Sequence, residues 1–284
     1  MTDLRGLLAG TGPVLMPGAH DALSARMIQE AGFTAYGVGG AALSATQLAL
    51  PDIGILSFGE YRDAVSRIME GSGLPVLIDG ENGFGDVKAV TRTVRSFERL
   101  GAGGIAFEDL NFPPRLGRPP TVIPVAEMKA KLRAALAARQ DERMMIVART
   151  DAAYAADLDE AIARITGYAA LGVDAVIVPG LPDRDAYLRL RDAVALPILA
   201  IVVPGSPWFA PTAQDLQEIG IEAGIYPAAL LTRMVSAIDD GLKAIRTMNG
   251  ASAGAIDMGG VARLLHVPVW TEIDQRFDER TSGA

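Results

Sequence analysis

Short apolar runs alternate along this chain with longer stretches in which apolar residues recur every three or four positions. The runs have the composition of β-strands, and there are eight of them, at residues 13–19, 34–40, 75–81, 104–109, 144–151, 175–180, 197–203 and 224–227. The stretches between them, most clearly residues 87–100 and 158–171, have the spacing of one helix face. Several of them end in glycine, as in EAGF and RLGAGG, which is typical of a helix C-terminus.

The strict alternation of strand and helix indicates the fold class. Strands that are apolar on both faces belong to a parallel sheet covered by helices. Eight such units in 284 residues fit an α/β fold of the (β/α)8 TIM-barrel type better than an open doubly wound sheet. No linker or low-complexity segment divides the chain, so we predict one domain over residues 1–284, with residues 251–284 as a C-terminal helical extension.

The C-terminal extension contains the apolar run VARLLHVPVW. Its large side chains Leu264, Leu265 and Trp270 would be exposed to water unless the extension packed on the barrel or on a neighbouring subunit. We therefore expect the protein to form a homo-oligomer.

Charge and composition exclude several classes of function. The net charge is -8 and no stretch is rich in Lys and Arg, so nucleic acid is not expected as a partner. The chain has no cysteine, which excludes disulfides, thiolate metal sites and cysteine nucleophiles. No apolar stretch reaches the roughly 20 residues that a membrane helix needs, and the N-terminus does not have the pattern of a secretory signal. We expect a cytoplasmic protein with no membrane partner.

Polar groups or bare glycines stand at the ends of four consecutive predicted strands. They are Gly39 and Gly40, Asp79 and Glu81, Glu108 and Asp109, and Arg149 and Asp151. In a barrel of this kind the carboxyl ends of the strands form the active site. Carboxylates that gather there repel one another unless a cation lies among them, and an oxygen-only ligand set favours Mg2+ or Mn2+ over Zn2+. An arginine opposite the acids is suited to hold a carboxylate or to neutralise an enolate.

These residues also have simpler interpretations. Any one of the acids could form an ordinary ion pair or cap a helix, but the agreement of four adjacent strands favours a metal site. Gly37, Gly39 and Ala42 spell G-x-G-x-x-A, the pattern of a dinucleotide-binding loop. Pro51 soon follows and no clean helix is expected to open there, so we disfavour a dinucleotide site.

Four segments together resemble the isocitrate lyase and phosphoenolpyruvate mutase superfamily. They are GGAALSATQLALPDIGILSFGEY, PVLIDGENGFGD, GIAFEDL and IVARTDA. The resemblance implies a (β/α)8 barrel whose C-terminal helix is swapped between subunits, usually in a dimer of dimers. It also implies Mg2+, with Mn2+ as the alternative, held by Asp79, while Glu81 and Glu108 act mostly through bound waters.

The same resemblance assigns further roles one position at a time. Gly39 and Gly40 match the backbone donors that bind a substrate carboxylate, and Ser44 in the same segment is a further candidate for substrate binding. Arg149 matches the arginine that binds a 2-oxo acid. Asp52 matches an acid near the metal that is a candidate nucleophile in the mutase branch, although an Asp after a Pro is also an ordinary turn residue.

Departures from the superfamily pattern narrow the reaction. Isocitrate and methylisocitrate lyases carry a K-[KR]-C-G-H motif in the loop after the fourth strand, whereas residues 114–118 here read PRLGR, with Leu116 in place of the acidic Cys. Gly180 stands where those lyases generally have a Glu. Both features look most like the oxaloacetate decarboxylase branch. That branch has a His after the eighth strand, whereas this chain has the sequence YPA from Tyr226.

We therefore expect an Mg2+-dependent carbon–carbon lyase that decarboxylates a small 2-oxo acid such as oxaloacetate through a metal-stabilised enolate. Arg149 would stabilise the enolate, and water or Tyr36 would protonate it. The loop at 110–124 would act as a lid, with Arg115 or Arg118 pairing with a substrate carboxylate. The alternatives are a carbon–carbon lyase for a methylisocitrate- or dimethylmalate-like acid, phosphonopyruvate mutase or hydrolase chemistry with attack by Asp52, and a non-catalytic relative that binds 2-oxo acids.

Overall fold

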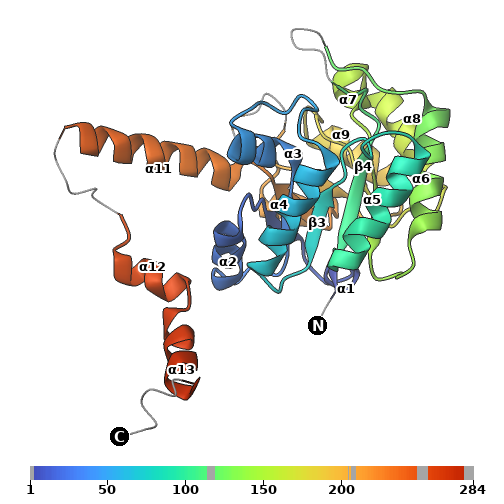
Figure 1. Ribbon diagram of the computed structural model, residues 1–284. Coiled ribbons are helices and arrows are strands. Elements are labelled where there is room, and N and C mark those ends of the chain that lie inside the picture. The colour runs from blue at the N-terminus through green and yellow to red at the C-terminus, as the bar shows by residue number, and fades with distance from the viewer. Residues whose placement is uncertain (1–2, 114–118, 204, 206–208, 248–254, 278–284) are drawn as a thin grey trace, which may run out of the picture. The chain divides into compact units, whose positions relative to one another are not determined.

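The chain divides into two compact units, Met1–Thr232 and Arg233–Ala284. The computed structural model describes residues 3–113, 119–203, 205, 209–247 and 255–277. The first unit contains all the strands of the described residues and is shown with its helices in Figure 1.

Eight parallel strands form the centre of the first unit, and each of the eight predicted strand regions overlaps one of them. They are β1 (Val14–Pro17), β2 (Tyr36–Val38), β3 (Val76–Asp79), β4 (Gly104–Glu108), β5 (Met145–Arg149), β6 (Ala175–Ile177), β7 (Leu199–Ile201) and β8 (Ala223–Tyr226). The strands hydrogen-bond in the orders β2-β3-β4-β5-β6 and β1-β8-β7. Single parallel bridges, Gly18 to Gly37 and Val176 to Ile198, join the two groups. The strands therefore follow one another around a closed ring, which confirms the (β/α)8 barrel.

Helices connect the strands, and α4 (Phe58–Glu70), α5 (Val87–Leu100) and α6 (Val125–Ala138) lie outside β3 and β4 (Figure 1). The main connecting helices are α2 (Ala22–Glu30), α4 (Phe58–Glu70), α5 (Val87–Leu100), α6 (Val125–Ala138), α8 (Leu158–Ala169), α9 (Arg184–Ala193) and α10 (Ala213–Ile219). The helix predicted at residues 87–100 has those bounds. It begins where the Asp86 carboxylate accepts hydrogen bonds from the N–H groups of Lys88 and Ala89, and it ends at Gly101, whose φ is 84°.

The core of the first unit has an inner and an outer layer. The inner layer fills the barrel with residues such as Leu77, Val147 and Leu199, and the outer layer lies between strands and helices. The short N-terminal helix α1 (Leu4–Leu8) adds Leu4 and Leu8 to the inner layer, and Leu4 lies beside the first residue of β4. Because α1 covers the amino ends of the strands, the carboxyl ends remain for a functional site.

The second unit consists of helical segments. Helix α11 (Ala229–Arg246) runs across the boundary between the units, and α12 (Met258–Leu264) and α13 (Val267–Phe277) follow it. The prediction of a helical extension is therefore confirmed for residues 255–277. Its large apolar side chains are exposed in the single chain, and Trp270 is 64% exposed. The swap of this extension between subunits stays a prediction. None of the helices among the described residues has the length and apolar character needed to cross a membrane.

Candidate active site

Arg149 is the centre of a cluster of carboxylates at the carboxyl end of the barrel. Its Nη1 atom lies 2.9 Å from Oε2 of Glu108 and 3.1 Å from Oδ2 of Asp79, and its Nη2 atom lies 2.8 Å from Oδ1 of Asp151. Glu108 and Arg149 are register partners on β4 and β5, and Asp79 ends the next strand, β3. The structure thus brings Arg149, Asp79 and Glu108 together, because the ends of adjacent parallel strands meet at one edge.

Glu81 joins the cluster from the loop that follows β3. Its φ is 53°, an uncommon left-handed conformation for a residue with a side chain, and only 8% of its surface is exposed. The Glu81 N–H group donates to Oδ1 of Asp79 at 3.0 Å, and the Glu108 N–H group donates to the Glu81 carbonyl at 3.0 Å. A Cβ atom on Gly40 would lie 1.7 Å from Oε1 of Glu81. Gly40 is therefore required to leave room for this carboxylate.

Gly39 and Gly40 follow β2 and open a short helix, α3 (Gly40–Leu43), which continues as a π-helical turn at Ser44–Leu48. We predicted that no clean helix opens there, and the segment before Pro51 is a four-residue α-helix followed by a π-helical turn, not one regular helix. Gly83 and Gly85 have positive φ values of 84° and 144°, so they shape the loop after β3.

Burial and mutual repulsion make ionisation of two acids costly. Burial, followed by the charges of Asp79 and Glu108, raises the pKa of Glu81 well above its usual value. Burial also raises the pKa of Glu108 well above its usual value, although the Arg149 charge opposes this shift. For Arg149, burial alone would lower the pKa, but Asp151, Glu108 and Asp79 raise it well above the usual value. Arg149 is therefore a permanent cation, whereas burial favours the neutral forms of Glu81 and Glu108.

A small chamber lies inside the ring of strand ends. It has a volume of about 50 Å³ and is lined on one side by Asp79, Arg149 and Gly39. The opposite side is formed by apolar side chains from the strands that carry no acids, Ile177, Ile201 and Ile225. Leu77 of β3 and Ala106 of β4 also line the chamber, so its charged groups come from β3 and β5, while β6 to β8 contribute only apolar side chains.

A second, larger cavity of about 360 Å³ lies beside the loop after β3. Ser44, Asp52 and Glu81 line it together with the aromatic rings of Phe58 and Phe84. Asp52 is an exposed residue, yet the partial desolvation of its carboxyl group, followed by the charge of Asp79, raises its pKa. Ser44 and Asp52 therefore share this cavity with Glu81, whereas Asp79 and Arg149 line the smaller chamber.

One predicted site residue, Tyr36, is not brought to the cluster. Tyr36 is fully buried among the outer-layer residues, because Gly37 is the residue of β2 that faces the barrel interior. Burial raises the pKa of Tyr36, and its hydroxyl has no hydrogen-bond partner among the described residues. Tyr36 lines neither of the two cavities. Arg118, with Arg115 and Leu116, lies outside the described residues.

The acid cluster fits a metal ion that is held partly through water. In the described part of the chain, no three His, Cys, Asp or Glu side chains are arranged as a ready ligand set. The carboxylates of Asp79 and Glu108 are instead paired with the Arg149 guanidinium, which contacts both of them. Burial, and after it the neighbouring acids, disfavours the ionised forms of Glu81 and Glu108, and a nearby divalent cation would favour those ionised forms. Mg2+ prefers oxygen donors, so these residues fit an Mg2+ ion that Asp79 would bind directly and that Glu81 and Glu108 would bind through water.

The sequence alone assigns no role to Tyr61 and Tyr154 at the site, and it places Asp151 there without specifying what it does. Tyr61, fully buried on α4, donates its hydroxyl to the Asp79 carbonyl at 2.6 Å and fixes the end of β3. Asp151 forms an ion pair with Arg149. Its position directly after β5 was the only feature of the sequence that pointed to a place in the site. The ring of Tyr154 fills the space above Gly180, where a Cβ atom would lie 2.4 Å from Cε1 of Tyr154.

Comparison with known proteins agrees with this geometry. Residues 4–246 match the protein family described as phosphoenolpyruvate phosphomutase. A probable 2-methylisocitrate lyase 2 from Corynebacterium glutamicum is 37% identical over 84% of this chain and 78% of its own. An oxaloacetate decarboxylase from Rhodopseudomonas palustris is 33% identical over 97% of this chain and 94% of its own.

A solved structure gives the same result for the fold. A phosphonopyruvate hydrolase in complex with oxalate and Mg2+ superposes with a TM-score of 0.88 at 25% identity, covering 97% of this chain and 98% of its own. The family match extends over most of the chain, and both relatives are more than 30% identical to it. The chain therefore belongs to the phosphoenolpyruvate mutase/isocitrate lyase superfamily of lyases and mutases.

Proposed function

We propose that this protein decarboxylates a small 2-oxo acid such as oxaloacetate and releases pyruvate, with Mg2+ as its metal. One observation carries the proposal: the inner chamber has a cationic, acid-flanked side at Arg149 and an apolar side at Ile177, Ile201 and Ile225. The volume of about 50 Å³ favours a small substrate.

The polar side would hold the end of the substrate that is not lost. The guanidinium of Arg149 and the backbone N–H groups of Gly39 and Gly40 are donors for a carboxylate and for the oxygen at C2. Asp79 would hold the metal, with Glu81 and Glu108 acting through water. When bound, Mg2+ supplies Lewis-acid polarisation of a carbonyl oxygen.

The apolar side would favour loss of the second carboxylate. An ionised carboxylate against Ile177, Ile201 and Ile225 loses hydration and meets no compensating cation on that wall. Carbon dioxide is neutral, so the apolar wall disfavours the reactant charge more than the product. The environment therefore lowers the barrier for breaking the bond between C3 and C4.

The electrons of the broken bond account for the product. The pair moves from C3–C4 into a C2–C3 double bond, and the negative charge develops on the C2 oxygen, where Arg149 stabilises it. Carbon dioxide leaves, and a proton from water adds at C3 to give pyruvate. The step needs no covalent nucleophile, so Asp52 has no bond-forming role in it. Tyr36 is not used in this proposal, because its hydroxyl lies in the outer layer of the core.

The relatives support this reaction class without specifying the substrate. The Rhodopseudomonas palustris protein that aligns over nearly the whole chain is an oxaloacetate decarboxylase. The phosphonopyruvate hydrolase was solved with oxalate and Mg2+, and oxalate places oxygens on adjacent carbons in one plane, as do the carboxylate and the enolate oxygen of an enolised 2-oxo acid.

A second candidate is cleavage of a carbon–carbon bond in a methylisocitrate- or dimethylmalate-like acid. It is favoured by the 37% identity to a probable 2-methylisocitrate lyase and by the apolar wall, which can receive methyl groups as well as a departing carboxylate. Phosphonopyruvate chemistry, with Asp52 as nucleophile, is the third.

The first experiment is a measurement of pyruvate formation from oxaloacetate with Mg2+, from which the metal-only background is subtracted. EDTA-treated protein is the control. Turnover well above background that EDTA abolishes supports the proposal. No turnover of oxaloacetate, with turnover of methylisocitrate, dimethylmalate or phosphonopyruvate, replaces it with the second or third candidate. Binding of oxalate without turnover of any of these acids would indicate a non-catalytic relative.

A further inference from the structure

Asp109 is a fully buried carboxylate that the proposed reaction does not use. It follows Glu108 directly at the end of β4. Burial of a carboxylate is costly unless hydrogen bonds or a cation compensate for the missing water. The partners of Asp109 therefore indicate why the chain keeps a charge at this position.

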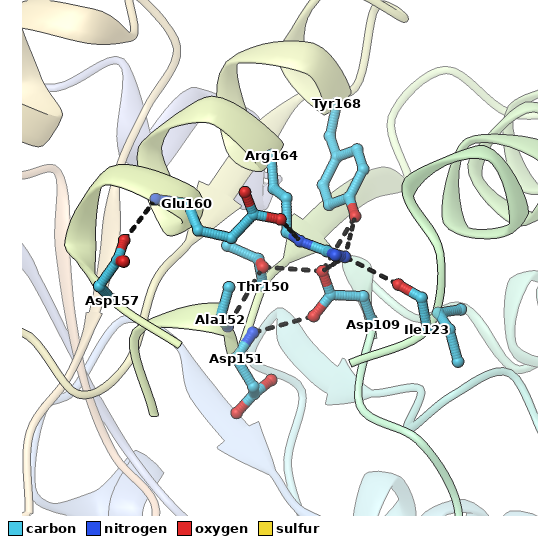
Figure 2. Close-up of polar contacts among 9 residues, drawn as sticks. All are labelled: Asp109, Ile123, Thr150, Asp151, Ala152, Asp157, Glu160, Arg164 and Tyr168. Carbon is cyan, nitrogen blue, oxygen red and sulfur yellow. Dashed lines mark hydrogen bonds and ion pairs between the residues drawn. The ribbon is translucent and has the colours of Figure 1, made fainter. Parts of the chain in front are cut away.

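The two oxygens of Asp109 face different parts of the barrel (Figure 2). Oδ2 accepts hydrogen bonds from the Thr150 hydroxyl at 2.7 Å, the Tyr168 hydroxyl at 2.9 Å and Nη1 of Arg164 at 3.3 Å. Oδ1 accepts from the backbone N–H group of Asp151 at 3.0 Å. One oxygen is thus held by α8 and Thr150, while the other holds the backbone at the carboxyl end of β5.

The backbone that Asp109 holds leads directly to Arg149. Asp151 is 2% exposed, and its Oδ1 atom lies 2.8 Å from Nη2 of Arg149. The remaining oxygen of Asp151 and the Nε atom of Arg149 have no hydrogen-bond partner among the described residues. At Nη2, the orientation of the Arg149 guanidinium therefore depends on where the backbone of Asp151 places the Asp151 carboxylate.

Asp109 is also tied to the base of the loop after β4. Its carbonyl accepts a hydrogen bond from the Ile123 N–H group at 2.8 Å, and Nη1 of Arg164 donates to the Ile123 carbonyl at 2.8 Å (Figure 2). The N–H group of Asn111 donates to the Thr121 carbonyl at 2.8 Å in the same short ladder. The carboxylate is therefore held in a rigid frame made of β4, α8 and this loop base.

We infer that Asp109 is a positioning residue for Arg149, acting through the Asp151 peptide. The rigid frame fixes Asp109, Asp109 fixes the Asp151 N–H group, and Asp151 orients the guanidinium that faces the substrate. The kinetic part of this inference rests on the proposed function, whereas the geometric part does not.

The test compares Asp109→Asn with Tyr168→Phe. An amide has only one acceptor oxygen, so Asp109→Asn disrupts the bonds to Oδ1 or to Oδ2, whereas Tyr168→Phe removes one donor to Oδ2 and leaves the Asp151 bond in place. We expect Asp109→Asn to lower kcat/KM by about 10- to 100-fold and Tyr168→Phe to change it less than about threefold. Crystal structures should show that the Arg149 guanidinium separates from the Asp151 carboxylate in Asp109→Asn and stays beside it in Tyr168→Phe.

A purely structural role for Asp109 would give a different result. In that case both variants lose melting temperature and activity in proportion, and the ion pair between Arg149 and Asp151 persists in both crystals. If Asp109→Asn fails to fold, the test uses Asp109→Glu, which keeps the charge that pairs with Arg164 but moves the carboxylate oxygens by one methylene. The readout is again whether the ion pair between Arg149 and Asp151 persists in the crystal. If the wild type does not act on oxaloacetate, the proposed function falls, while the position of Arg149 in the crystals still tests the role of Asp109.

Discussion

The guanidinium of Arg149 reaches across β4 to the carboxylate of Asp79, with Nη1 of Arg149 3.1 Å from Oδ2 of Asp79. The same nitrogen contacts Glu108 on the intervening strand. Residues from three neighbouring strands therefore share one cation, and the planar fork of arginine allows its second nitrogen to bind Asp151 at the same time.

Replacement of Arg149 by lysine should abolish most activity although the charge is kept. A single ammonium cannot contact Asp79 and Glu108 on one side and Asp151 on the other, so the cation at the chamber would be misplaced. We expect kcat/KM to fall at least about 100-fold, since the developing charge would no longer be stabilised by a well-placed cation. Steady-state pyruvate formation checks this. Activity within a few fold of wild type would show that charge alone, not the fork, is required.

Replacement of Asp79 by alanine should abolish the Mg2+ dependence while leaving the fold nearly intact. Asp79 is the candidate direct ligand, and its side chain is one quarter exposed, so its removal leaves no large cavity. Calorimetric titration with Mg2+ and thermal melting check the two parts. The matched control is Asp86→Ala, seven residues further along the same loop, which removes the cap of α5 and should lower the melting temperature slightly without affecting Mg2+. Unchanged Mg2+ binding in Asp79→Ala would refute the assignment.

The elements of the barrel could be predicted because their signals are local. The helix at 87–100 has an apolar face of helical period, an Asp at its start and a glycine at its end, and its observed bounds are those predicted. The gathering of Asp79, Glu108 and Arg149 also followed, because the ends of parallel strands meet at one edge.

The features of the site that the sequence did not predict depend on which way side chains point from their strands and on contacts between distant elements. The face of β2 that carries Tyr36 depends on a strand of three residues, too short for an alternating pattern to show which side is buried. Asp109 and Asp151 are adjacent in sequence to Glu108 and near Arg149, but only the three-dimensional packing of α8 shows that one supports the other. A single sequence contains no signal for such long-range contacts.

The turn before β5 should make stability depend on acid pH. The side-chain and backbone hydrogen bonds from Arg143 lower the pKa of Asp141 to about 2. A carboxyl whose folded pKa is depressed contributes stability above its usual value of 3.8 and loses it as the pH falls towards 2. Wild type should therefore melt slightly above Asp141→Asn at pH 6, and the difference should shrink between pH 4 and pH 2. Because Asp141 is screened by solvent, a large difference is not expected, and one that grew on acidification would contradict the assignment.

The C-terminal unit should mediate self-association, as an exposed Trp270 and Phe277 would otherwise face water. We expect wild type to sediment as a species larger than the 29.8 kDa chain, and Trp270→Lys to shift it towards the monomer. Glu272→Lys, an exposed position on the same helix, is the control for added positive charge. A monomeric wild type would overturn both the oligomer and the swapped extension.

Gly40→Ala should reduce activity by displacing the carboxylate of Glu81, which packs against Gly40 in the wild type. The added Cβ atom would lie 1.7 Å from Oε1 of Glu81, so the side chain of Glu81 must move, while its backbone is held by the bonds to Asp79 and Glu108. We expect at least about a tenfold loss of kcat with a modest loss of melting temperature, because a repositioned acid alters the charge around Arg149. Gly59→Ala on α4, where the nearest atom lies 4.0 Å from the added Cβ, should keep full activity and melt at the same temperature or higher. Equal activity of the two variants would mean that Glu81 does not act from the position it has here.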